Sequence, residues 1–154
     1  MEIIYGERIG KQGRIRVGCV AVIFDEKREK ILLTRRADNG QWCLPSGGME
    51  PGESVSEACE RETFEETGLR VRVVRLTSIY SSPNRLVVYG ENDRFQIVSL
   101  SFEVEVIGGK IGLSNETTEV GFYSPGEIKA MDVLLHHKQF VRDALAGQEA
   151  AFIW

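Results

Sequence analysis

The chain has 154 residues, a length that fits one compact domain, so we expect a single domain over residues 1–154. Hydrophobic residues make up 42% of the sequence and charged residues 27%, the balance of a globular protein that buries a core. The formal net charge of −4 argues against a nucleic-acid-binding surface, which is normally basic.

No secretory or membrane-spanning segment is predicted. The first residues lack the basic stretch that opens a signal peptide, and the longest apolar run, residues 17–24, is too short to cross a bilayer. The three cysteines, Cys19, Cys43 and Cys59, are an odd number without CxxC spacing, which favours reduced packing residues over disulfides. We therefore expect a cytoplasmic protein with no membrane partner.

The first predicted elements are strands. Residues 14–24 are rich in β-branched side chains and predict a strand that is buried on both faces near residues 20–24. A charged turn at residues 25–30 leads to a second short strand at residues 31–35, and we expect the two strands to form a hairpin. A loop is predicted at residues 37–51, because glycine and proline interrupt that stretch repeatedly.

A helix is predicted at residues 53–67. Ser54 is a suitable N-cap, Glu57 lies three residues later as in a capping box, and Gly68 ends the helix.

Strands dominate the second half of the chain, and helices end it. Strand patterns lie at residues 70–81, 94–107 and 120–123, and Gly108-Gly109 predicts a hairpin turn into a further strand at residues 110–113. Helical patterns follow at residues 127–131 and 133–146. The sequence therefore predicts a mixed sheet with helices, of the α/β or α+β class.

Seven glutamates crowd residues 50–66: Glu50, Glu53, Glu57, Glu60, Glu62, Glu65 and Glu66. Three of them lie near the end of the predicted helix, where the helix dipole disfavours negative charge. Glu62 and Glu66 form an i,i+4 like-charge pair, which costs roughly 0.2–0.5 kcal/mol, whereas Glu57 and Arg61 form a compensating pair. A bound hard cation such as Mg²⁺, which prefers oxygen ligands, would relieve the crowding. The alternative is a solvated acidic face.

The spacing of these residues carries a motif. The chain reads Gly47-x5-Glu53-x7-Arg61-Glu62-Thr63-x-Glu65-Glu66-x-Gly68-Leu69. This pattern resembles the Nudix box, Gly-x5-Glu-x7-Arg-Glu-U-x-Glu-Glu-x-Gly-U, in which U is a bulky apolar residue. Every fixed polar or glycine position of the box is matched. Thr63 departs from the pattern, since the family usually has an aliphatic residue at this core-facing position, and we expect a packing cost there.

The resemblance implies a fold and an activity. Nudix proteins are α/β/α sandwiches with a mixed sheet, and Nudix hydrolases are pyrophosphohydrolases that cut the diphosphate bond of a nucleoside diphosphate linked to another moiety. The cofactor implied is Mg²⁺, with Mn²⁺ as the other candidate. Glu62 and Glu66 are the implied metal ligands, with Glu65 as a third and the backbone carbonyl of Ser46 as a fourth.

Other box residues are implied to position those carboxylates. Arg61 resembles the residue that orients them through bidentate hydrogen bonds, and Glu53 resembles the residue that pairs with this arginine. Gly47 and Gly68 are expected to take backbone conformations closed to other residues.

The general base and the phosphate contacts lie outside the box. In this family the base also comes from a loop after the long strands, so Glu119 is the first candidate and Glu116 the second, with a solvated loop acid as the alternative for each. Arg35 and Arg36 end the second strand, and one of them is a candidate for binding a substrate phosphate; a surface charge is the alternative.

Several aromatic and imidazole side chains are predicted to pack rather than to react. His136 and His137 lie on the last predicted helix, and Trp42 precedes the box. For all three, packing is the favoured interpretation. Trp154 is expected either to pack across a homodimer interface or to fray.

The sequence is compatible with several substrates and with two alternative functions. ADP-ribose, a nucleotide sugar or a nucleoside triphosphate are all compatible with the box, and the partner expected is a nucleotide-derived small molecule rather than nucleic acid. Pro83 lies at a spacing similar to that in ADP-ribose pyrophosphatases, but the acidic signature expected after it is missing. A catalytically inactive Nudix-fold binding module is the main alternative function, and an isopentenyl-type isomerase is a third.

Overall fold

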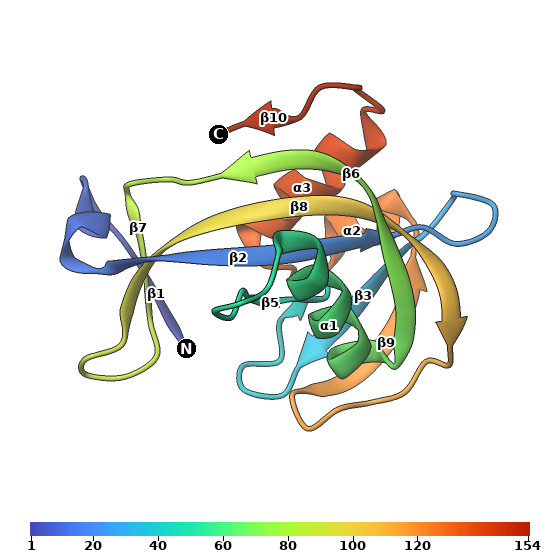
Figure 1. Cartoon of the computed structure of the whole chain (residues 1–154), viewed down its shortest axis with the longest axis horizontal. Helices are drawn as coiled ribbons and strands as arrows, with labels where there is room; N and C mark the ends of the chain where they lie inside the picture. Colours follow the sequence, from blue (N-terminus) through green and yellow to red (C-terminus); the bar gives the residue numbers. More distant parts are fainter.

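The computed structural model describes residues 1–154 (Figure 1). Its strands are β1 (Glu2–Tyr5), β2 (Arg14–Ile23), β3 (Ile31–Arg36), β4 (Trp42–Cys43), β5 (Ser46–Gly48), β6 (Leu69–Tyr80), β7 (Arg85–Val88), β8 (Arg94–Gly109), β9 (Thr117–Tyr123) and β10 (Phe152–Ile153). Its helices are the 3₁₀ turn η1 (Ile9–Gln12) and the α-helices α1 (Val55–Thr67), α2 (Pro125–Ala130) and α3 (Leu135–Leu145). None of these helices is long and apolar enough to cross a membrane.

The strands form two sheets. The larger sheet has seven strands in the order β1-β7-β8-β2-β5, and β8 also pairs with β6, which in turn pairs with β10. The smaller sheet has the order β4-β3-β9. Strand β2 runs parallel to β8 and antiparallel to β5, so the sheet is mixed, as the sequence predicts.

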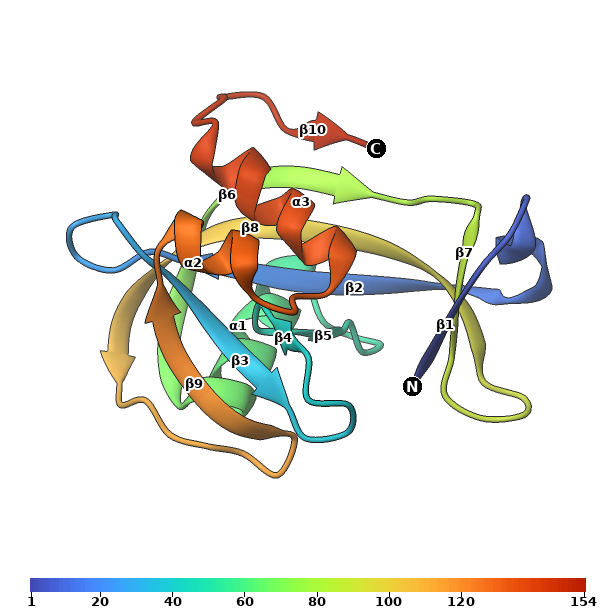
Figure 2. The same ribbon diagram turned by 180° about the vertical axis from the view of Figure 1, so that it is seen from behind.

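Helices cover both faces of strand β2. Residues 19–23 are all buried, and alternate side chains point to opposite faces of the strand. Cys19, Ala21 and Ile23 pack with α1, whereas Val20 and Val22 pack with α2 and α3. Figures 1 and 2 show these two helical layers from opposite sides, with α1 in front in the first view and α3 in the second. The predicted α/β/α sandwich is confirmed.

Helix α1 begins and ends where its sequence predicts. The Ser54 side chain accepts a hydrogen bond from the Glu57 amide and the Glu57 carboxylate accepts one from the Ser54 amide, which completes the capping box. Gly68 ends the helix in the left-handed conformation, with φ of 74°, and its N–H donates to the Phe64 carbonyl. These local signals place the box glutamates on one rigid helix.

The predicted hairpin between the strands at residues 14–24 and 31–35, which are β2 and β3, is wrong. Only Phe24 and Ile31 form an antiparallel bridge at the turn. Beyond it β3 leaves β2 and pairs with β9 and β4, whereas β2 pairs with β8 along its whole length and with β5 at residues 18–20.

The predicted turn at Gly108-Gly109 is also wrong. Strand β8 continues through Gly109, which pairs with Leu69 of β6, and residues 110–113 form no strand. The Gly112 N–H donates instead to the Thr67 carbonyl, at 2.8 Å, and so satisfies one of the carbonyls left free at the end of α1.

The predicted loop at residues 37–51 contains two short strands. Ser46 of β5 pairs with Val20 of β2, which fixes the start of the box to the central sheet. Three further strands, β1, β7 and β10, were not predicted, because each has only two to four residues and no strong pattern. The C-terminal Trp154 does not fray, since its N–H donates to Ile79 and its indole N–H to Asp143.

Candidate active site

Arg61 is the hub of the box segment. Its Nε lies 2.5 Å and its Nη2 3.0 Å from the two carboxylate oxygens of Glu53, and Nη2 also donates to the Gly48 carbonyl at 3.0 Å. Its Nη1 donates to Glu62 at 2.8 Å and to Glu65 at 3.3 Å. One planar guanidinium thereby joins the loop before the helix to the glutamates on it.

The charged groups of this network shift one another's pKa values. The Arg61 guanidinium and the Glu50 amide lower the pKa of Glu53 to about 2. In turn, the carboxylates of Glu53 and Glu62 raise the pKa of Arg61. The expected Glu57–Arg61 pair is wrong, because the Glu57 carboxylate is held by the amide of Ser54 in the capping box. Arg61 therefore compensates more of the acidic crowding than sequence spacing suggests.

Glu62 occupies the space that a side chain at position 47 would need. An added Cβ on Gly47 would collide with the Glu62 carboxyl group. Since Gly47 has no positive φ, the expectation of an unusual backbone conformation is wrong here and holds only for Gly68. The close approach leaves the carboxylate half-buried, and burial raises the pKa of Glu62.

Glu66 is the buried carboxylate of the site. Its residue surface is 8% exposed, and its Oε2 accepts a hydrogen bond from the Ser46 N–H at 3.0 Å. Burial raises the pKa of Glu66 to about 8; the neighbouring carboxylates of Glu62 and Glu116 add to the rise, and the Ser46 amide opposes it. Glu66 takes part in no ion pair, and the more distant Arg36 only weakly opposes the rise of its pKa.

The remaining box positions divide between surface and core. The Glu65 side chain is 56% exposed, and its Oε2 lies 3.3 Å from the Arg61 Nη1. Thr63 is buried, as expected for a core-facing position, and its hydroxyl donates to the Cys59 carbonyl at 2.7 Å, which satisfies the polar atom. No three acidic, histidine or cysteine side chains are close enough together to form a complete metal cluster from protein alone.

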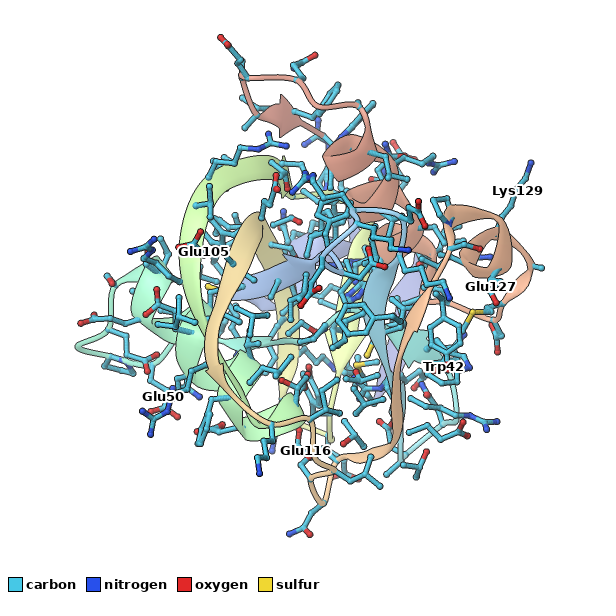
Figure 3. The ribbon with its side chains drawn as sticks, turned by 90° about the vertical axis from the view of Figure 1, so that its right-hand side faces the viewer. Trp42, Glu50, Glu105, Glu116, Glu127 and Lys129 are labelled. Atoms are coloured by element: carbon cyan, nitrogen blue, oxygen red, sulfur yellow. The ribbon has the colours of Figure 1, made fainter.

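A cavity of about 440 Å³ opens beside Glu66, and we call it the box cavity. Arg36, Glu66, Tyr89, Glu116 and Thr117 are among the residues that line it. Figure 3 shows Glu116 on the loop that joins β8 to β9. Glu116 is near enough to raise the pKa of both Glu62 and Glu66, so this exposed acid faces the box.

The other candidate base, Glu119, lies elsewhere. It is within strand β9, where it is the register partner of Arg35, and its carboxylate lies 2.6 Å from the Arg35 Nη1. Both side chains are about half exposed. The structure thus places Glu116, the second candidate base, on the box cavity, and pairs Glu119, the first candidate, with Arg35.

The sequence matches the NUDIX domain over residues 14–144. The chain belongs to the Nudix family. It is 36% identical over 121 residues to an ADP-ribose pyrophosphatase of Methanocaldococcus jannaschii, covering 77% of this chain and 67% of that protein. It is 37% identical over 109 residues to a MutT-like protein of Streptomyces ambofaciens, covering 71% and 64%. The chain spans about two thirds of the length of these relatives.

A solved structure supports the same assignment. The NUDIX hydrolase from Nitrosomonas europaea superimposes with a TM-score of 0.73 at 27% identity, and the match covers 90% of this chain and 93% of that one. The expectation of a Nudix pyrophosphohydrolase with a mixed sheet is confirmed at the level of the family.

The two arginines at the end of β3 differ in this Nudix fold. Arg35 donates to Glu119 and to the Gly40 carbonyl, so its guanidinium is engaged at the surface. Arg36 forms two hydrogen bonds with Asp38, at 2.9 and 2.7 Å, and lines the box cavity. Of the two predicted phosphate contacts, Arg36 is the one beside the box.

The histidines pack inside the protein. His137 is 3% exposed and its Nδ1 accepts a hydrogen bond from the Leu44 N–H at 2.9 Å, which holds the chain just before the box. Burial lowers the pKa of His137 to about 3, so the ring is neutral. Trp42 packs edge-on against Tyr123, with ring centroids 5.0 Å apart. The three cysteines are free and buried, as expected.

Sequence reasoning missed Arg85, at the start of β7. Its residue surface is only 2% exposed. Its guanidinium lies over the ring of Tyr80, with the guanidinium carbon 5.1 Å from the ring centroid. A lone arginine at a strand end gives no local signal of burial, so only the packed structure identifies it.

Proposed function

We propose that this Nudix chain hydrolyses the diphosphate bond of a nucleoside diphosphate linked to another moiety, with Mg²⁺ or Mn²⁺ as cofactor. The observation that carries the proposal is Glu66, a buried carboxylate with no cation of its own, beside Glu62 and the start of the box. A hydrolase of this type needs such a carboxylate to bind a divalent metal ion where a diphosphate can reach it.

The donor set fits a hard cation. Mg²⁺ usually takes one or two protein carboxylates and completes its coordination with water and substrate phosphates, so a full protein cluster is not required. Glu62 and Glu66 are the proposed ligands, with Glu65 and the Ser46 carbonyl as the further candidates. When bound, the metal would neutralise the charge that develops on the phosphates during hydrolysis.

The protein's own residues supply position and proton transfer in this proposal. Arg61 and Glu53 are positioning residues, since their ion pair anchors the Glu62 carboxylate to the loop. Water attacks one phosphorus, and the bridging P–O bond breaks with its electron pair leaving on the departing phosphate. A carboxylate accepts the proton of the attacking water; the position of Glu116 on the box cavity favours it over Glu119.

The proposed scope keeps three substrate classes: ADP-ribose, nucleotide sugars and nucleoside triphosphates. The similarity to an ADP-ribose pyrophosphatase and to a MutT-like protein supports this breadth. We also propose a single domain over residues 1–154, and a reducing compartment such as the cytoplasm, which suits three buried free thiols.

A substrate panel tests the proposal. The purified protein is incubated with ADP-ribose, UDP-glucose and dGTP in Mg²⁺, in Mn²⁺ and in EDTA, and the nucleoside monophosphate that is released is measured by chromatography. We expect turnover that requires the metal and falls strongly in Glu66→Gln. Glu50→Gln is the matched control, because Glu50 is exposed on the same segment. Substrate binding without turnover under every condition would instead indicate an inactive binding module.

A further inference from the structure

A second cavity of about 120 Å³ adjoins the box cavity, and we call it the arginine cavity. Arg16, Arg36, Arg85 and His136 line it, together with the strand Ser46–Gly48 that opens the box. No aspartate or glutamate is among its lining residues. Arg36 and Tyr89 line both cavities, so a ligand in one can extend into the other.

Arg85 is buried in this cavity without a partner for its charge. Its Nη1 is fully buried and makes no hydrogen bond. No carboxylate acts on the guanidinium, and burial lowers the pKa of Arg85. Buried guanidinium groups are normally paired, because an unpaired charge in a protein interior is costly. Arg85 therefore has the capacity to donate hydrogen bonds to an anion that enters the cavity.

Two other residues of the cavity, His136 and Arg16, also lack acceptors. The buried Nδ1 of His136 makes no hydrogen bond. Arg16 stacks its guanidinium near the rings of Phe95 and Tyr89, with centroid distances of 5.2 and 5.9 Å, and it makes no ion pair. Arg36 is paired with Asp38, whereas Arg16 and Arg85 contact aromatic rings and form no ion pair. The arginine cavity therefore holds two guanidinium groups without a carboxylate partner.

We propose that the arginine cavity binds an anionic group, a phosphate or a carboxylate, at the distal end of the moiety that the scissile diphosphate carries. This inference rests on the proposed function. The planar guanidinium of Arg85 matches both oxyanions, which accept two hydrogen bonds from it. A neutral sugar or nucleobase could accept a hydrogen bond but would leave the buried charge uncompensated, so the anion is the better ligand.

The kinetic test uses two substrate pairs that differ in one distal charge. The first pair is ADP-ribose 1″-phosphate and ADP-ribose, and the second is UDP-glucuronate and UDP-glucose, so the pairs separate phosphate from carboxylate recognition. We expect the wild type to have the higher kcat/KM for the anionic member of at least one pair. In Arg85→Met that preference should fall by about 30-fold or more, because truncating one partner of a buried charge pair has an effect of this size.

Two further variants sharpen the kinetic test. Arg85→Lys keeps the charge without the planar fork and should retain part of the preference. Arg94→Met is the matched control, since Arg94 is exposed and lines neither cavity, and it should keep the wild-type ratio. Equal kcat/KM for both members of each pair in the wild type, or a ratio unchanged in Arg85→Met, would overturn the inference. Failure of the wild type to hydrolyse any of the four substrates or dGTP would instead reject the proposed function.

A binding test is independent of turnover. Inorganic phosphate is added in EDTA, and thermal melting is followed. Phosphate should raise the Tm of the wild type and of Arg94→Met, because a ligand that binds only the folded state stabilises it, and should raise the Tm of Arg85→Met much less. An equal rise in all three proteins would contradict the inference. Should Arg85→Met fail to fold, Arg85→Lys replaces it and should show a smaller rise than the wild type.

Discussion

The two adjoining cavities each bury one ionisable side chain that has no ion-pair partner, and the two side chains are of opposite type. The box cavity buries the carboxylate of Glu66 and is faced by Glu116, whereas the arginine cavity buries the guanidinium of Arg85. Burial acts on both in the same sense, against the charged form, so it raises the pKa of Glu66 and lowers the pKa of Arg85. Arg36 lies at the boundary, with Asp38 as its partner.

Under the function proposed above, this difference favours a ligand with two kinds of charge. A cation at Glu66 together with an anion at Arg85 would neutralise both cavities at once, and a metal-bound diphosphate that carries a distal anionic group provides both. The contrast predicts that changes in the box cavity act mainly on chemistry, whereas changes in the arginine cavity act mainly on the choice of substrate.

The largest effect should come from the general base. Glu116→Gln should lower kcat by roughly 10²–10⁴, the usual range for a general base, with KM little changed. Glu119→Gln serves as the comparison and should be nearly as fast as the wild type, since its carboxylate is paired with Arg35 at the surface. Steady-state kinetics on the best substrate measure both. A slow Glu119→Gln with a fast Glu116→Gln would reverse the assignment, and two fast variants would place the base within the box.

Arg61→Lys should have the next largest effect. Lysine keeps the charge but not the fork that binds Glu53 and Glu62 together, so we expect kcat/KM to fall about 10- to 100-fold, as for groups that orient metal ligands. Circular dichroism should show an intact fold. A near-normal kcat/KM would mean that Arg61 only offsets the charge of the helix.

Glu66→Gln should stabilise the metal-free protein. The pKa of Glu66 is raised in the folded state, so the folded protein binds the extra proton between about pH 4.5 and 8 and loses stability as the pH rises through this window. Glutamine keeps an acceptor for the Ser46 N–H and has no charge to bury. In EDTA at pH 8 we expect the free energy of unfolding to rise by about 1–3 kcal/mol in denaturant titrations. A variant less stable than the wild type at pH 8 would refute this.

His137, which lines the arginine cavity, should give the protein's stability a pH dependence that is opposite in direction to that of Glu66 and smaller. The pKa of His137 is depressed to about 3, so the unfolded chain takes up the proton first and stability is lost as the pH falls below about 6.5. In His137→Asn the side-chain oxygen can still accept the Leu44 N–H, and the loss between pH 7 and 5 should shrink by up to about 2 kcal/mol. Unfolding titrations at the two pH values would measure it. An unchanged loss would assign the acid sensitivity to other groups.

Much of the fold was predictable from local signals. The capping box of Ser54 and Glu57 and the left-handed Gly68 fix the limits of α1, and the buried run in β2 predicts helices on both faces of the sheet. Strand pairing was less predictable. The expected hairpin fails because β2 and β3 pair with β8 and β9 from much later in the chain, and a pattern of hydrophobic residues does not encode which strands pair.

The sequence by itself determined the box: the spacing of Arg61, Glu62 and Glu66 sets their places on a helix, because helix geometry repeats every few residues. Only the tertiary structure decided which carboxylate outside the box faces it and that Arg85 is buried without a partner. Desolvation depends on contacts between segments distant in the sequence, and the same residue type is unremarkable on a surface and costly inside. The buried and unpaired environments of Glu66 and Arg85 therefore arise only when the chain is folded.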